Sequence, residues 1–327
     1  MKLSQIALTL GLVFSGGLAQ AEPLELNLFG ASPGGLWSLL GAGLDRAVKK
    51  SDPSSVVTYQ STGGGISNIG LLSKQIADIA IVHNAEIKIA AAGDEPFKSP
   101  VTNMRGIAYI YNWAPMHFFI SKSIADEHNI SSLDDLAKAK VALRIGVNRA
   151  GNITNNVALF MLAQVGITEE IMKAKGGGII KASTSDQASH LQDGRIDVVT
   201  NGVFVLHSSF RAIDEKSDVI LLTVPENVIA ATNEKFGTQT FIIPGGSYSK
   251  QPNDIKTSAL GALLVTREGM KEEVIYDLTK ALIENIDEVR AVHKSMSALD
   301  LELLSSQRIL PFHPGAERAF REAGLIK

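Results

Sequence analysis

The stretch LELNLFGASPGGLW, residues 24–37, decides the architecture of the chain. Residues 24–29 alternate apolar and polar side chains, which predicts a β-strand, and residues 30–35 form a glycine-rich turn. Apolar side chains then recur at helical spacing: Leu36, Trp37, Leu40, Leu44, Ala47 and Val48. The stretch therefore predicts a strand, a tight loop and a helix.

The same unit follows once more in the first third of the chain, and a third strand comes after it. A strand at 55–60 leads through the loop Ser61-Thr62-Gly63-Gly64-Gly65 into a helix at 66–74. A third strand at 77–82 ends abruptly in the polar pair His83-Asn84. Polar residues at such strand ends commonly line a cleft in α/β proteins.

A second α/β region begins after Trp113. We expect strands at 116–121, 143–147 and 195–199, the last ending at Thr200-Asn201-Gly202, which makes Asn201 a further cleft candidate. Residues 131–136 and 183–186 are typical helix starts, and a polar loop at 148–155 precedes another helix. The C-terminal part predicts a strand at 262–266, one helix at 271–292 and a final helix after Pro314. Two interleaved α/β lobes explain this order best.

Composition excludes several classes of protein. Hydrophobic residues are 45% and charged residues 20% of the 327 residues, which predicts a folded chain with a substantial core. The chain has no cysteine, so thiol catalysis, disulfides and cysteine metal sites are excluded. A formal net charge of −3 gives no electrostatic indication of a nucleic-acid partner.

Residues 1–21 read as a cleavable secretory signal peptide. Lys2 supplies the positive charge, residues 6–14 are an apolar run too short to span a bilayer, and Ala19-Gln20-Ala21 fits a cleavage site. The mature chain would begin at Glu22 and act in the periplasm, without inserting into the membrane.

The glycine-containing loops suit an anion. Glycine lets backbone N–H groups approach a ligand, and each helix start adds unpaired N–H donors with a partial positive charge. Several such loops at neighbouring strand ends would form a cleft for a carboxylate or phosphate. The spacings of a dinucleotide fingerprint, a P-loop and an H-E-x-x-H zinc helix are absent from the sequence. We therefore expect no enzyme, no cofactor, no catalytic residues and no metal site.

The chain resembles the solute receptors of TRAP transporters in the TAXI class, over nearly its full length. The resemblance lies in residues 29–37, 61–68, 77–84 and 148–155, and in Phe312-His313-Pro314-Gly315-Ala316-Glu317-Arg318. It implies an α/β, two-lobed periplasmic binding protein of type II with an interlobe ligand cleft. The implied first lobe is 22–115 plus 255–327, and the implied second lobe is 116–254.

The resemblance also implies a function and a site. The receptor would capture a small carboxylate, such as glutamate, 2-oxoglutarate or a related dicarboxylate, and deliver it to the TRAP permease subunits. Carried over, the ligand-binding residues are Ser32, Gly35, Trp37, Thr62, Gly63, Gly64, His83 and Asn84 in the first lobe, and Asn148, Asn152, Thr154 and Asn201 in the second. We add Asn112 and Trp113, which lie at the expected crossing between the lobes, and Arg149, which lies in the 148–155 loop. Arg144 and Arg149 are the cationic candidates near the 148–155 loop.

Two alternatives stay open at this point. The protein could present its ligand to a periplasmic sensor kinase instead of a permease, and the neighbouring gene would distinguish these roles. A hydrolase is a third and less favoured possibility.

Overall fold

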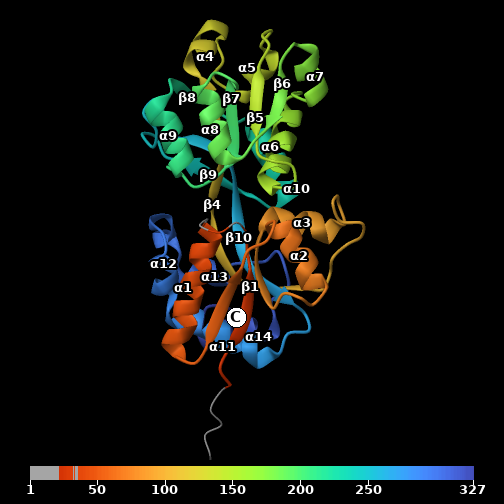
Figure 1. The fold of residues 1–327 in the computed structure, drawn as a ribbon, viewed down its shortest axis with the longest axis vertical. Coiled ribbons are helices and arrows are strands. Elements are labelled where there is room, and N and C mark those ends of the chain that lie inside the picture. The colour runs from red at the N-terminus through yellow and green to blue at the C-terminus, as the bar shows by residue number, and fades with distance from the viewer. Residues whose placement is uncertain (1–21, 32, 34–35) are drawn as a thin grey trace, which may run out of the picture.

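The computed structural model describes residues 22–31, 33 and 36–327. The predicted signal peptide, residues 1–21, and the predicted site residues Ser32 and Gly35 lie outside the described residues. Figure 1 shows two lobes stacked along the long axis and joined by two strands, β4 (Met104–Ser121) and β10 (Ile255–Arg267). We define the first lobe as the elements before β4 and after β10, and the second lobe as the elements between them. The predicted two-lobed α/β fold is confirmed.

The first lobe is built from three strand–helix units and a C-terminal group of helices. Strands β1 and β2 pair in parallel, as do β1 and β3, while β10 runs antiparallel to β3. The units are β1 (Glu25–Phe29), α1 (Leu36–Ser51), β2 (Val56–Gln60), α2 (Gly65–Ser73), β3 (Ile79–His83) and α3 (Asn84–Ala92). The C-terminal helices are α11 (Glu272–Glu284), α12 (Ile286–Arg290), the short 3₁₀ helix η1 (Lys294–Ala298), α13 (Leu301–Ser305) and α14 (Pro314–Glu322).

The second lobe repeats this design around the far ends of the crossing strands. Its strands are β5 (Arg144–Val147), β6 (Gly178–Lys181), β7 (Val198–Gly202), β8 (Val219–Leu221) and β9 (Gln239–Ile243). Its helices are α4 (Lys122–His128), α5 (Leu133–Lys138), α6 (Ile153–Gln164), α7 (Glu169–Ala174), α8 (Thr184–Gln192), α9 (Ser208–Lys216) and α10 (Glu226–Phe236). The continuous strand path is β2-β1-β3-β10-β4-β7-β5-β6, with β8 on β4 and β9 on β10.

The crossing strands change partners between the lobes. In β4, residues up to Pro115 pair with β10, and residues from Met116 onward pair with β7. The β4–β10 register shifts between Leu260 and Ala262, a bulge next to Gly261. A Cβ at Gly261 would lie 2.3 Å from the Tyr109 hydroxyl, so this position requires glycine. The predicted boundary at 115/116 coincides with this change in β4, whereas the predicted boundary at 254/255 lies just before β10, which pairs with β9 up to Ala259 and with β4 from there on. As lobe boundaries, both stay a prediction.

Helix α1 shows how the predicted apolar pattern produces packing. Leu40, Leu44 and Val48 are each 1% exposed and face the β-sheet of the first lobe. Burying one such side chain stabilises the fold by about 1.5–3 kcal/mol before cavity effects are counted. The helix is therefore fixed by one face, which leaves its N-terminal end at Leu36 available to the space between the lobes.

One predicted element was wrong. The single helix expected at 271–292 is two helices, α11 and α12, separated at Asn285. The Asn285 amide donates to the Ala47 carbonyl at 3.2 Å and to the Ser51 hydroxyl at 2.9 Å, both in or at the end of α1. Asparagine in a helix interior competes for backbone and neighbouring acceptors, and here that competition ends the helix. Of the helices in the described part of the chain, none combines the length and apolar character needed to cross a membrane.

Candidate functional site

A cleft of about 410 Å³ lies between the two lobes. The first lobe contributes the end of β1, the start of α1, the loop before α2 and the β3–α3 junction, and the second lobe contributes the starts of α6 and α8. The lining residues are Ala31, Leu36, Trp37, Gly63, Gly64, Gly65, His83, Glu86, Gly151, Asn152 and Thr184. A cleft of this size suits a small molecule.

The first-lobe wall of the cleft is a connected aromatic group. The Trp37 indole N–H donates to the Tyr111 hydroxyl at 3.0 Å, and this hydroxyl lies 3.3 Å from His83 Nε2. On its other side, His83 Nδ1 lies 3.3 Å from a Glu86 carboxylate oxygen, which also accepts the His83 backbone N–H at 2.9 Å. Burial raises the pKa of the Tyr111 phenol far above its usual value, so it stays protonated and able to donate.

The predicted glycine loop before α2 lies in the cleft. Gly63, Gly64 and Gly65 line it, and Gly64 has a φ of 104°, in the region that favours glycine. Thr62 holds the loop from behind, because its hydroxyl accepts the Gly64 N–H at 3.1 Å. The fully buried Asn68 completes this support by donating to the Gly30 carbonyl at 3.0 Å and the Ile81 carbonyl at 2.9 Å. Thr62 therefore positions the loop, while the three glycines form the surface.

The second-lobe wall is a hydrogen-bonded network of predicted site residues. Asn152 caps α6, with its carboxamide oxygen accepting the Thr154 N–H at 2.9 Å. The Asn148 amide donates to the Thr154 hydroxyl at 3.0 Å and contacts the Asn201 oxygen at 3.3 Å. Asn201 in turn donates to the Thr184 hydroxyl at 2.8 Å. Asn152 and Thr184 line the cleft, and the buried Asn148, Thr154 and Asn201 hold them in place.

Besides the start of α3, whose cap His83 lines the cleft and whose first turn holds Glu86, the N-termini of four helices meet at the cleft, two from each lobe. They are the starts of α1 at Leu36, α2 at Gly65, α6 at Ile153 and α8 at Thr184, and each start or its capping residue lines the cleft. Helix N-termini carry unpaired N–H donors and a partial positive charge. The arrangement can bind an anion through backbone groups that come from both lobes.

Both candidate arginines are paired with carboxylates. Arg149 is exposed and bonds to Asp186 at 2.9 Å. Arg144 lies at the start of β5, the opposite end from the cleft loop, and its guanidinium holds Asp197 through two bonds of 3.0 and 2.6 Å. This partner also raises the pKa of Arg144. Neither side chain is among the described residues that line the cleft.

Three predicted site residues lie at the crossing instead of in the cleft lining. Asn84 is fully buried and donates to the Gly237 carbonyl at 2.6 Å, while its oxygen accepts the Gly261 N–H at 3.0 Å. Asn112 donates to Gln239 at 3.1 Å. Trp113 packs near the Tyr111 ring, with 6.3 Å between centroids. As ligand contacts, these three residues stay a prediction.

Sequence reasoning missed several residues of this site. Tyr111 and Glu86 complete the aromatic wall, Thr184 lines the second-lobe side, and Phe204 packs edge-on against Tyr111 with 5.0 Å between ring centroids. Thr184, the first residue of α8, could have been found from the sequence, because Ser183-Thr184-Ser185-Asp186 is recognisable as a helix start.

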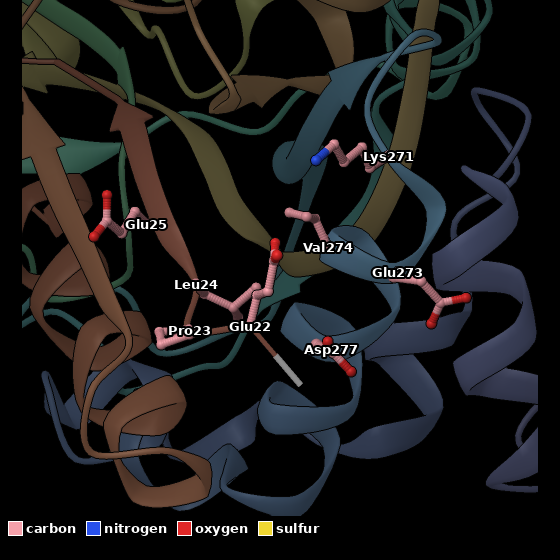
Figure 2. A pocket seen from close by; sticks show the side chains of 8 residues that line it. All are labelled: Glu22, Pro23, Leu24, Glu25, Lys271, Glu273, Val274 and Asp277. Carbon is pink, nitrogen blue, oxygen red and sulfur yellow. The ribbon is translucent and has the colours of Figure 1, made fainter. Parts of the chain in front are cut away.

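A larger hollow, of about 850 Å³, lies at the base of the first lobe. Figure 2 shows Glu22, Glu273 and Asp277 around it, with Lys271 at its upper edge. Burial and the neighbouring Glu273 raise the pKa of Asp277. This hollow is formed by one lobe alone and contains no predicted site residue, so the interlobe cleft is the better candidate. Within the described ranges, no cluster of three or more histidine, aspartate or glutamate side chains could hold a metal ion.

Comparison with known proteins places the chain among two-lobed binding proteins. A family model described as NMT1-like family matches residues 28–324. PhnD1 from Prochlorococcus marinus, in complex with methylphosphonate, gives a TM-score of 0.56 at 12% identity, covering 92% of this chain and 98% of that chain.

Two further solved structures have the same fold. MatC from Rhodopseudomonas palustris, with bound malate, gives a TM-score of 0.55 at 12% identity over 91% of this chain and 96% of its own. The periplasmic binding protein BugD gives 0.54 at 13% identity over 94% and 95%. At these identities the matches show the fold, which is the mixed α/β fold of type II periplasmic binding proteins.

Proposed function

The chain belongs to the NMT1-like family, a family of periplasmic solute-binding proteins of transporters, and from this premise we propose that it captures a small carboxylate in its interlobe cleft and delivers it to a TRAP permease. The family is not one of enzymes. The proposal includes residues 1–21 as a signal peptide removed in the periplasm, with the mature chain starting at Glu22.

The convergence of four helix N-termini on one cleft carries the carboxylate part of this proposal. The donors come from α1 and α2 in the first lobe and from α6 and α8 in the second. An anion placed between them interacts with both lobes at once, so it favours the closed arrangement over the open one. A permease could then distinguish the loaded protein from the empty one by its shape.

The site residues in this proposal fall into two groups. Trp37, Gly63, Gly64, His83 and Asn152 line the cleft and would touch the ligand. Thr62, Asn148, Thr154 and Asn201 would position these groups through the hydrogen bonds described above. MatC, which has the same fold, was solved with malate, and this supports a small carboxylate as the class of ligand.

Thermal melting of the mature protein tests the proposal. The protein is unfolded and refolded to remove bound solute, then melted with a panel of small carboxylates, amino acids, sugars and phosphates. A ligand at 100 times its Kd stabilises the folded state by about 2.7 kcal/mol, so one carboxylate should raise the Tm selectively. A rise with sugars alone would overturn the proposal.

A matched pair of variants locates the site. Asn152→Ala removes the cap of α6 in the cleft, and Thr168→Ala removes the cap of α7, away from the cleft. Each should cost about 1 kcal/mol of stability. Asn152→Ala should weaken carboxylate binding about tenfold, whereas Thr168→Ala should leave it unchanged; equal binding in both would contradict the assignment.

A transport assay tests the partner. Vesicles containing the co-expressed TRAP permease should take up the carboxylate only when the loaded protein is present outside. Uptake that is equally fast without the protein would contradict this part of the proposal.

A further inference from the structure

We propose that the cleft selects a ligand with one carboxylate and an apolar carbon skeleton, and discriminates against dicarboxylates. This inference rests on the proposed function and narrows its ligand class. It follows from the charges around the cleft and from the hydrogen bonds of its aromatic wall.

The charge of the lining is the first observation. Among the described residues that line the cleft there is no lysine or arginine, and there is one acidic residue, Glu86. Arg149, in the loop next to the cleft, already pairs with the Asp186 carboxylate. A second ligand carboxylate would be desolvated without a cation to compensate it, which is costly in a closed cleft.

The position of Glu86 adds repulsion to this lack of compensation. Its side chain is 3% exposed, and a Cβ built on Gly65 would lie 1.5 Å from its Oε2 atom. Glu86 therefore sits directly against the first residue of α2, fixed there by the His83 backbone N–H. An acidic side chain whose carboxylate already faces the His83 N–H and ring thus lies on the first-lobe side of the cleft, and two carboxylates side by side repel each other where water is excluded.

The aromatic wall offers carbon surface instead of polar partners. Trp37, Tyr111 and His83 direct their polar atoms at one another, and His83 directs its second nitrogen at Glu86. The Trp37 ring stands 4.8 Å from the His83 ring, centroid to centroid, at 43°. Because its polar atoms are used internally, this wall suits an alkyl or aromatic group more than a second charged one.

The remaining donors are sufficient for one carboxylate. The starts of α2, α6 and α8 line the cleft from both lobes at Gly64, Asn152 and Thr184, and the first N–H groups of a helix have no partner within the helix. Together these groups define one anionic subsite beside one apolar wall. A monocarboxylate with a short carbon chain or a ring fills both.

Pairs of ligands that differ by one carboxylate test the inference. Calorimetric titration of the refolded mature protein would compare pentanoate with glutarate, 2-oxopentanoate with 2-oxoglutarate, and benzoate with phthalate. We expect the monocarboxylate of at least one pair to bind tenfold or more tightly than its dicarboxylate partner. Tighter dicarboxylate binding would overturn the inference and leave the proposed function intact, whereas no binding by any of the six acids would overturn both.

A charge-neutral variant tests the role assigned to Glu86. Glu86→Gln keeps the size of the side chain and should reduce tenfold the ratio of the monocarboxylate affinity to the dicarboxylate affinity. Glu302→Gln changes the net charge equally at an exposed position on α13 and should leave the preference unchanged. An unaltered preference in a folded Glu86→Gln protein would contradict the repulsion argument, and the wild-type ligand pairs decide the inference if that variant does not fold.

Discussion

The two lobes are separated by the cleft on one side of the molecule and are in direct contact on another side. At the cleft they are separated by a space of about 410 Å³, lined by glycines, helix starts and the aromatic wall. Where α3 meets α10 they touch directly: Asn84 donates to the Gly237 carbonyl at 2.6 Å, and Lys235 pairs with Asp94 at 2.5 Å. Figure 1 shows α10 of the upper lobe directly above α3 of the lower lobe.

This difference separates two residues that are adjacent in the sequence. His83 lines the cleft, whereas Asn84 is fully buried and joins α3 both to Gly237 and to the crossing strand at Gly261. A buried amide must have its hydrogen bonds satisfied, so Asn84 serves the contact between the lobes. A ligand that contacts His83 would therefore lie next to Asn84, whose side chain bonds α3 to the second lobe and to the crossing strand.

Removing the Asn84 side chain should have the largest effect. Asn84→Ala leaves the Gly237 carbonyl and the Gly261 N–H without their partner in a buried place, which should cost about 4 kcal/mol of unfolding free energy. Urea unfolding would measure this loss, and Asn253→Ala, at an exposed asparagine, should cost less than about 0.5 kcal/mol. Equal stability of the two variants would show that the α3–α10 side does not hold the lobes.

Acid should have the second-largest effect, by lowering the free energy of unfolding through His117 on the crossing strand β4. His117 on β4 is fully buried, donates to the Pro115 carbonyl at 2.8 Å and accepts from the Tyr248 hydroxyl at 2.9 Å. Burial lowers the pKa of His117 from 6.5 to about 3. The unfolded chain therefore takes up a proton below pH 6.5 that the folded protein does not, so stability falls as the pH drops from 6.5 toward 3.

The size of this acid effect can be measured on matched variants. His117 alone should remove about 2.3 kcal/mol of unfolding free energy between pH 6.5 and pH 4.5. Burial also lowers the pKa of His207 and His313, and these groups act in the same direction. The free energy of unfolding would be measured by urea unfolding at a series of pH values. It should fall less steeply with decreasing pH in His117→Gln than in the wild type, whereas His128→Gln should match the wild type. The same pH dependence in all three proteins would contradict the assignment.

A methyl group in the cleft should have the smallest effect on stability and a specific effect on binding. Gly65→Ala forces Glu86 to move, because the new Cβ would lie 1.5 Å from its carboxylate oxygen, and should cost about 2 kcal/mol. Carboxylate binding should weaken at least tenfold. Gly70→Ala in the same helix meets nothing within 4 Å and should bind normally, so a comparable binding loss in both variants would place the site elsewhere.

The glycine loops and the strand ends were predictable because their signals are local. Gly63-Gly64-Gly65 and Asn152 stand next to abrupt changes of pattern in the sequence, and both line the cleft. Tyr111 could not be found in this way, because it lies in the middle of the apolar run of β4 and is 3% exposed. Its role depends on Trp37 and His83, which are far from it in the sequence and reach it through the fold.

Glu86 and the burial of Asn84 could not be found from the sequence for a related reason. Residues 85–92 are mostly alanine and isoleucine, and helix α3 was not anticipated there, so Glu86 had no predicted face. Asn84 was expected to touch the ligand because polar residues at strand ends commonly do. Its burial depends on Gly237 and Gly261, and contacts over such separations are not encoded in any local pattern.

The place of β10 in the sheet has a consequence for the order in which the chain folds. β10 lies between β3 and β4 in the first lobe, yet it follows the entire second lobe in the chain. During synthesis the second lobe is therefore nearly complete before the middle strand of the first lobe is available to pair. Contacts between distant parts of a chain form slowly. A nascent chain stopped before Ile255 should expose β3 as an open sheet edge, and a chaperone that shields such an edge would act at that stage.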